Sequence, residues 1–365
     1  MSIPQRHLAP LTAQALLLPY PATVPDVTLY AKFVKFALPH ATGTSGYAAS
    51  HGNRPQVSLF LTSGIGLGSE LWVPFIRRLF DLQSAQNSPV HILSVWTLDY
   101  ANHGDAATVN ERALTQHYSE VFHAENQESA VDALLRSYVL SPQERANFVG
   151  VAHSGGGGGC FVSAMFQYPK CPFTSIIFVE SSFIDRYAKP IFDAMLNAVA
   201  KANRKKPTMW ASTEEAMAFM TSHFPVQGYH PDVVAVMAET AFRETYPSEN
   251  GGDPAKRVTT KMSPAQETAT YNHSERMIRV WEQLQEKLDV LRIHVVTGTN
   301  KGFWPKPIAK AIAQGIERNR DKFASVSAVE GAGHFVPQEK PYDLAGAVFR
   351  ILQLDASSGK FAAKL

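Results

Sequence analysis

The stretch that decides the fold is Gly150-Val-Ala-His-Ser-Gly-Gly156, which follows the apolar run Asn147-Phe-Val149. An apolar run that ends in a serine among small residues is typical of a buried strand that turns sharply into a helix. Ala152 and Gly156 stand two positions before and two positions after Ser154, where such a turn leaves no room for a large side chain. The stretch therefore predicts a serine exposed between a buried strand and a helix.

Similar apolar runs lie on both sides of this stretch. They are Val57–Thr62, His91–Leu98, Ser175–Glu180, Arg292–Gly298 and Phe323–Val329, and helical segments such as Leu71–Leu82, Ser129–Tyr138 and Ile308–Arg318 lie between them. Apolar strands without alternation, separated by helices, indicate a parallel sheet covered on both faces. Val27–Phe36 does alternate and predicts antiparallel edge strands. We expect an α/β fold with a mostly parallel central sheet.

Residues 181–272 interrupt this order of strands and helices. They contain no strand pattern, whereas Ile191–Lys201, Glu214–His223 and Pro231–Phe242 have helical periodicity. We expect a helical cap inserted between two parts of one core, residues 1–180 and residues 273–365. Its apolar side chains either line a substrate pocket or pack inside the cap; they are Met195, Met217, Phe219, Met220 and Met237.

The composition excludes several classes of protein. With 45% hydrophobic and 18% charged residues and a net charge of +2 over 365 residues, we expect neither disorder nor a nucleic-acid partner. Cys160 and Cys171 are the only cysteines, too few for a disulfide framework and not spaced as metal ligands, so no metal or organic cofactor is expected. The apolar stretch Ala13–Leu18 lies between prolines and is too short for a signal or a membrane span.

The last three residues, Ala363-Lys364-Leu365, resemble the Ser-Lys-Leu address that directs proteins to peroxisomes. Alanine stands in place of the more common serine. The tail predicts binding to a peroxisomal import receptor and a peroxisomal location, with the cytoplasm as the alternative.

Four motifs follow one another in an order that is known from one family. They are Ser63-Gly-Ile65 after a strand, Leu98-Asp-Tyr-Ala-Asn-His-Gly-Asp105, the serine turn at Ser154, and Gly331-Ala-Gly-His334. Together they resemble the α/β-hydrolase superfamily from about Leu59 to Leu352, which implies the α/β-hydrolase fold with an inserted cap. The Asn102–Asp105 variant, the glycine-rich turn and the tail resemble a narrower group, the fungal toxin-biosynthesis and peroxisomal lipase-like hydrolases.

The resemblance also implies roles for individual residues. A serine hydroxyl is a poor nucleophile at neutral pH, so a histidine must take its proton and pass it to the leaving group. Ser154 is the expected nucleophile and His334 the expected general base. The backbone N–H groups of Gly155 and Ile65 would form the oxyanion hole.

The acid that would orient His334 departs from the common pattern. The usual position follows the strand that ends at Gly298, but residues 299–304 contain no Asp or Glu. Some relatives, such as certain haloalkane dehalogenases, carry the acid one strand earlier, which favours Glu180. Asp185 is the second choice, Asn300 is an alternative as a neutral acceptor, and Glu180 would otherwise be a salt-bridged surface carboxylate at a strand end.

A serine at this turn favours cleavage of an ester, lactone or thioester through an acyl-enzyme, since dehalogenase and epoxide-hydrolase relatives use an aspartate there. The narrower resemblance implies a small polyketide-like or acyl-CoA substrate in secondary metabolism. A C–C hydrolase, a non-hydrolytic isomerase, cyclase or lyase, and a silent binding protein stay open, as does a homo-oligomer. The run Gly155–Gly159 predicts a roomy or adaptable pocket; a phosphate loop is disfavoured because no Lys-Ser/Thr follows it.

Overall fold

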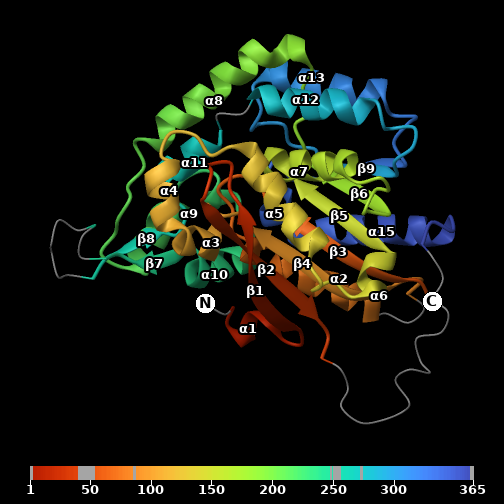
Figure 1. The fold of residues 1–365 in the computed structure, drawn as a ribbon, viewed down its shortest axis with the longest axis horizontal. Helices are drawn as coiled ribbons and strands as arrows, with labels where there is room; N and C mark the ends of the chain where they lie inside the picture. The colour runs from red at the N-terminus through yellow and green to blue at the C-terminus, as the bar shows by residue number, and fades with distance from the viewer. Residues whose placement is uncertain are drawn as a thin grey trace.

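The computed structural model describes residues 3–39, 54–84, 88–246, 249, 256–271 and 274–361. Its centre is an eight-stranded sheet in the order β1-β2-β4-β3-β5-β6-β9-β10 (Figure 1). The strands are β1 Thr12–Pro21, β2 Thr28–Ala37, β3 Gln56–Thr62, β4 His91–Asp99, β5 Phe148–His153, β6 Ser175–Val179, β9 Ile293–Gly298 and β10 Ser325–Val329. From β4 to β10 all neighbours are parallel, while β2 is antiparallel to both β1 and β4. The expected mostly parallel sheet is confirmed.

Helices cover both faces of this sheet, because alternate side chains of each buried strand point to opposite faces. In β3, Leu59 and Leu61 join an apolar cluster with α2 and α15, whereas Phe60 joins the cluster under α5 and α7. The helices of these layers and of the connecting segments are α1 Gln5–Leu8, α2 Val73–Ser84, α3 Gly104–Val109, α4 Glu111–His117, α5 Ala124–Arg136, α6 Pro142–Ala146, α7 Ser154–Gln167, α13 Lys306–Arg318, α14 Val336–Glu339 and α15 Pro341–Ser357, with a 3-10 turn, η1, at Ser69–Trp72. None of the described helices is long and apolar enough to pass through a bilayer.

The edge of the sheet differs from expectation in one strand. Ala13–Leu18 is the middle of β1, which pairs with β2 from Thr12–Ala37 to Pro21–Thr28. From the sequence, this stretch is only too short for a signal or a membrane span. Most of its side chains are exposed, so an edge strand of this kind shows little of the apolar pattern that marks a buried strand. Its prolines are tolerated because one side of an edge strand donates no hydrogen bonds to the sheet.

The long insertion between β6 and β9 is mostly helical. It contains η2 Arg186–Ala188, α8 Lys189–Asn203, α9 Thr213–Thr221, η3 Val226–Gly228, α10 Pro231–Thr240, α11 Pro264–Thr270 and α12 Ser274–Gln285. The expectation of no strands is wrong, because β7 Phe242–Glu244 pairs with β8 Val258–Thr260. Three residues are too few to display alternation. The expected boundary at residues 272 and 273 lies outside the described residues.

The inserted helices reach two sides of the core. Val233 and Val236 of α10 belong to the same apolar cluster as α2 and α15. By contrast, α8 and α12 lie on the side of α7, above it in Figure 1. Residues Trp281 and Leu284 of α12 and Phe192 of α8 are buried in the cluster that also contains Phe161 of α7. The insertion therefore roofs the helix that begins at Ser154.

Candidate active site

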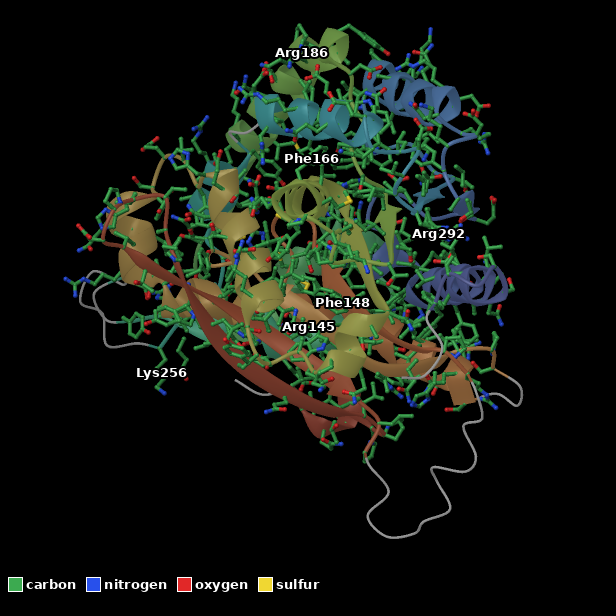
Figure 2. All side chains as sticks on the ribbon, turned by 45° about the vertical axis from the view of Figure 1, so that its right-hand side comes forward. Arg145, Phe148, Phe166, Arg186, Lys256 and Arg292 are labelled. Carbon is green, nitrogen blue, oxygen red and sulfur yellow. The ribbon has the colours of Figure 1, made fainter. Side chains whose placement is uncertain are left out.

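Two sharp turns at neighbouring strand ends build the site. Ser154 follows β5 and Glu180 follows β6, and each has a positive φ, 60° and 46° respectively. Such left-handed conformations are strained for residues with side chains. His153 pairs with Val179 across the two strands, so both turns lie side by side at the carboxyl edge of the sheet. Phe148, labelled in Figure 2, begins β5 at the opposite end of the strand from Ser154.

His334 lies between these two residues. Its Nε2 is 2.9 Å from Ser154 Oγ, and its Nδ1 is 3.4 Å from Glu180 Oε2. His334 and Glu180 are both buried, with 4% and 5% of their surface exposed. The structure thus brings together the serine, histidine and acid that the sequence singles out, in the order that proton transfer from serine to histidine requires.

Glu180 is surrounded by hydrogen-bond donors. Its Oε1 accepts from the Gly298 N–H at 2.8 Å and from Lys301 Nζ at 3.0 Å, and Oε2 accepts from Trp304 Nε1 at 3.3 Å. Burial alone would raise the pKa of Glu180, but the hydrogen bond and charge of His334 and the charge of Lys301 outweigh burial and lower this pKa to about 2. Glu180 is therefore ionised at neutral pH.

The two other candidates for the acid lie elsewhere. Asp185 accepts a hydrogen bond from Trp281 Nε1 at 2.8 Å and forms an ion pair with Arg318, so it ties α12 and α13 to the end of β6. Asn300 Oδ1 accepts from the Gly302 N–H at 3.0 Å and stabilises its own turn. The alternative for Glu180, a salt-bridged surface carboxylate at a strand end, does not hold: Glu180 pairs with Lys301, but its carboxylate is buried and also contacts His334.

The loop after β9 holds residues that sequence reasoning did not select. Phe303 stacks on the His334 ring, with centroids 4.3 Å apart and planes 7° apart, and Trp304 meets the same ring edge-on at 4.8 Å. From the sequence, this loop offers no acid and only Asn300 as a candidate. Its position after a parallel strand was the available signal, because loops at the carboxyl ends of such strands converge on one site.

The turn that carries Ile65 is held by two histidines. The Gly64 N–H donates to His153 Nδ1 at 3.3 Å, and the Gly66 N–H donates to His103 Nε2 at 3.1 Å. A Cβ on Gly64 would lie only 3.1 Å from Ser154 Cβ, so the turn packs directly against the serine. Burial lowers the pKa of both histidines to about 3, so both rings are neutral and can accept these hydrogen bonds.

The second nitrogen of each ring, His153 Nε2 and His103 Nδ1, shows which tautomer the ring has. His153 Nε2 lies 2.9 Å from the His334 carbonyl oxygen and therefore donates to it. His103 Nδ1 lies 2.7 Å from Asn102 Oδ1, and Asn102 Nδ2 donates to Thr270 Oγ1 of α11 at 2.7 Å. This arrangement joins the Ile65 turn to His334 and to the insertion.

A narrow cavity of about 50 Å³ opens beside Ser154. Gly155, Gly158 and Gly159 form one wall, but α12 packs so closely on them that a Cβ on Gly155 would lie 1.7 Å from Met277 Cε. The glycine run therefore admits a neighbouring helix and does not make the pocket roomy. Flexible methionine side chains can still move aside for a ligand.

The cap side chains considered for the pocket wall pack elsewhere. Met195 packs against the cluster under α7, and Met237 is buried with α2 and α15. Met217, Phe219 and Met220 pack around Trp210 and Phe242. The cavity is instead lined from α12 by Arg276, Met277, Val280, Trp281 and Leu284.

Sequence and fold comparisons agree on the family. The model of the alpha/beta hydrolase family matches residues 59–347. The chain belongs to this family. No curated protein matches this hydrolase in sequence, and its likeness to solved structures is one of fold.

Two solved structures illustrate that likeness. The peroxisomal alpha-beta-hydrolase Lpx1 from Saccharomyces cerevisiae has a TM-score of 0.70 at 16% identity, over 95% of this chain and 89% of that one. The thioesterase domain from the curacin biosynthetic pathway has a TM-score of 0.56 at 11% identity, over 94% and 99%. Both likenesses extend over nearly the whole α/β-hydrolase chain.

Exposed ion pairs hold α12, which lines the cavity of this hydrolase, in place. Arg186, at the top of Figure 2, donates to Glu282 of α12 from Nε at 3.0 Å and to Glu275 from Nη1 at 2.8 Å. These contacts are exposed, so each adds little stability by itself. Together with the bond between Asp185 and Trp281 they hold α12 against the start of α8, and so over the cavity.

Proposed function

We propose that this α/β-hydrolase cleaves an ester, lactone or thioester through an acyl-enzyme on Ser154. The observation that carries the proposal is the 2.9 Å contact between Ser154 Oγ and His334 Nε2, with His334 Nδ1 facing the ionised Glu180. A nucleophile, a base within hydrogen-bond reach and a group that orients the base are the parts that acyl transfer requires.

The reaction would run in two halves. His334 Nε2 takes the proton of Ser154 Oγ as this oxygen attacks the substrate carbonyl carbon, and Glu180 stabilises the imidazolium that forms. The backbone N–H groups of Gly155 and Ile65 stabilise the oxyanion. Gly155 is the second residue of α7, so its N–H has no helical acceptor. The imidazolium then protonates the leaving group, and water releases the acyl group by the same steps.

The lining of the cavity supports a narrower substrate class than membership of the family does. The cavity beside Ser154 is lined mostly by apolar groups, among them Val162, Phe178 and Leu284, which supports an acyl chain as the bound part of the substrate. A polyketide-like ester or an acyl-CoA thioester of secondary metabolism fits this description. The same proposal includes a helical cap at residues 181–272 and a fungal origin, and it leaves a homo-oligomer open.

A peroxisomal location is proposed from the tail. Ala363-Lys364-Leu365 lies outside the described residues, and the similarity to a peroxisomal hydrolase supports the idea through fold alone. A fluorescent fusion that keeps the free carboxyl terminus should accumulate in peroxisomes, and removal of the last three residues should leave it in the cytoplasm. Equal distribution of both forms would contradict the address and the import receptor as partner.

The mechanism is tested by covalent labelling. A fluorophosphonate should add one adduct to the native chain, detected by intact mass, and Ser154→Ala should abolish both the adduct and turnover of ester and thioester panels. The isomerase, cyclase and lyase alternatives need no acyl-enzyme, so normal turnover of a substrate by Ser154→Ala would overturn the proposal. Cleavage of a diketone but of no ester would assign the same residues to C–C hydrolysis.

A further inference from the structure

One end of the cavity beside Ser154 is polar, although most of its wall is apolar. Gln127 and Glu128 of α5 and Arg276 of α12 line the cavity together with Ser154. Glu128 Oε2 accepts from Ser163 Oγ at 2.7 Å, which places its carboxylate beside the third turn of α7. Ser163 is nine residues after Ser154, so at 1.5 Å per residue it lies roughly 13 to 14 Å along the helix from Ser154.

The ion pair at this end leaves donors unused. Arg276 Nε donates to Glu128 Oε1 at 2.7 Å, and Nη2 contacts the same oxygen. Neither of these contacts uses Nη1 of Arg276, whose side chain is 24% exposed. A guanidinium can only donate, so a ligand group that meets Nη1 must be an acceptor.

Gln127 adds a second, independent sign of a ligand. Its side chain is 6% exposed, and its amide nitrogen is buried without a hydrogen-bond partner among the residues that the structure describes. Buried polar groups are almost always paired, because an unpaired one destabilises the fold. Of the unpaired buried side-chain atoms in the described ranges, this one alone belongs to a residue of the cavity wall.

We propose that this end of the cavity binds a neutral oxygen atom of the acyl chain, a keto, hydroxyl or ether group roughly 13 to 14 Å from the carbonyl that Ser154 attacks. The pairing with Glu128 already neutralises Arg276, so a carboxylate there would meet a second carboxylate. A hydrocarbon chain would leave the Gln127 amide unpaired. The inference rests on the proposed acyl transfer and specifies an oxygenated acyl group as the substrate.

The test compares acyl esters that share one leaving group and one chain length. One ester is a plain hydrocarbon, others carry a keto or hydroxyl group at increasing distance from the carbonyl, and one ends in a carboxylate. In the native enzyme we expect kcat/KM to rise roughly 10- to 100-fold for the ester whose oxygen reaches the polar end, the gain of one or two hydrogen bonds to the site. The carboxylate ester should gain nothing.

Substitutions at the polar end of the cavity test whether this end causes the preference for the oxygenated ester. Gln127→Met, and the double variant Arg276→Met with Glu128→Gln, should lose the preference while they still hydrolyse the hydrocarbon ester. Arg279→Met is the matched control, because Arg279 lies on the same helix, pairs only weakly with Glu275 at 3.7 Å and does not line the cavity. Gln127→Met should also melt at or above the native temperature, since it removes an unpaired buried amide.

Failure of this inference differs from failure of the proposed function. Native enzyme that labels at Ser154 and cleaves all the esters equally, or variants that keep the preference, would overturn the oxygen site and leave the serine mechanism standing. Loss of melting temperature in Gln127→Met would show that the amide has a partner inside the fold, and would also overturn it. Absence of both labelling and ester hydrolysis would overturn the proposed function itself.

Discussion

Glu180 and Asp99 are two buried carboxylates at the carboxyl ends of β6 and β4 in one sheet. Their environments are opposite. Among the described residues, Glu180, after β6, meets only donors: Lys301, Trp304, His334 and a backbone N–H. Asp99 ends β4 and shares one cation, Lys32, with two other carboxylates. Burial and the nearby charge of Glu70 raise the pKa of Asp99 to about 7, whereas the pKa of Glu180 is lowered to about 2.

The difference shows how one side-chain type serves two purposes. Ser69 and Asp105 donate backbone N–H groups to Asp99 at 2.7 and 3.3 Å, and Lys261 of the insertion pairs with Asp105 at 2.5 Å. This cluster therefore joins β2, β4, η1 and the insertion. A structural cluster can hold a proton without loss, but a carboxylate that stabilises an imidazolium must be ionised whenever the histidine works.

The largest expected effect is on catalysis and separates the two carboxylates. Glu180→Gln should lower kcat by roughly 10³- to 10⁴-fold, because a neutral amide cannot stabilise the protonated His334 and can favour the wrong tautomer. Asp99→Asn, measured on the same ester, should change kcat little. Near-normal turnover by Glu180→Gln would mean that another residue orients His334. An equal loss of kcat in Asp99→Asn would mean that the two carboxylates do not differ in their effect on catalysis.

A smaller effect is expected where the two regions meet, at the turn of Ile65. His103→Leu removes the acceptor for the Gly66 N–H, so the turn of Ile65, the proposed oxyanion donor, loses one of its two supports. We expect kcat to fall roughly tenfold with little change in KM. His103→Gln restores an acceptor and should recover part of the loss. The control is His117→Leu, at an exposed histidine of α4. A rise in KM with unchanged kcat would point to substrate binding instead of the turn.

The smallest effect concerns stability and has opposite signs in the two regions. The pKa of Glu180 is lowered from 4.5 to about 2, so its ionised form stabilises the fold above pH 4.5 and this contribution is lost as the pH falls toward 2. The pKa of Asp99 is raised from 3.8 to about 7, so its contribution is complete below pH 3.8 and is lost as the pH rises through 7.

Urea unfolding at pH 4, 5.5 and 7.5 measures this difference. The loss of unfolding free energy in Glu180→Gln should grow with pH, while the loss in Asp99→Asn should shrink. Parallel pH dependence of the two variants would mean that donors and carboxylates around these groups do not set their ionisation as described.

Local patterns are enough to locate much of this hydrolase. The buried parallel strands are predictable because each is an unbroken apolar run, and Ser154 and His334 are recognisable because small residues surround them at strand ends. Glu180 is harder to select, since residues 299–304 contain no acid and only the resemblance to relatives that carry the acid one strand earlier favours it. β1 and the β7–β8 pair escape because an exposed edge strand and a three-residue strand have no distinctive pattern.

The environment of these residues depends on the folded chain. Contacts between segments far apart in sequence create this environment. Lys301 and Trp304 bind Glu180, Phe303 stacks on His334, and two neutral histidines hold the Ile65 turn. The glycine run shows the same division. Its composition predicts free space beside the serine, but only the packing of α12 decides that Met277 fills this space. Residue type determines which chemistry is available, whereas burial and neighbours determine which charge and hydrogen bond each residue has.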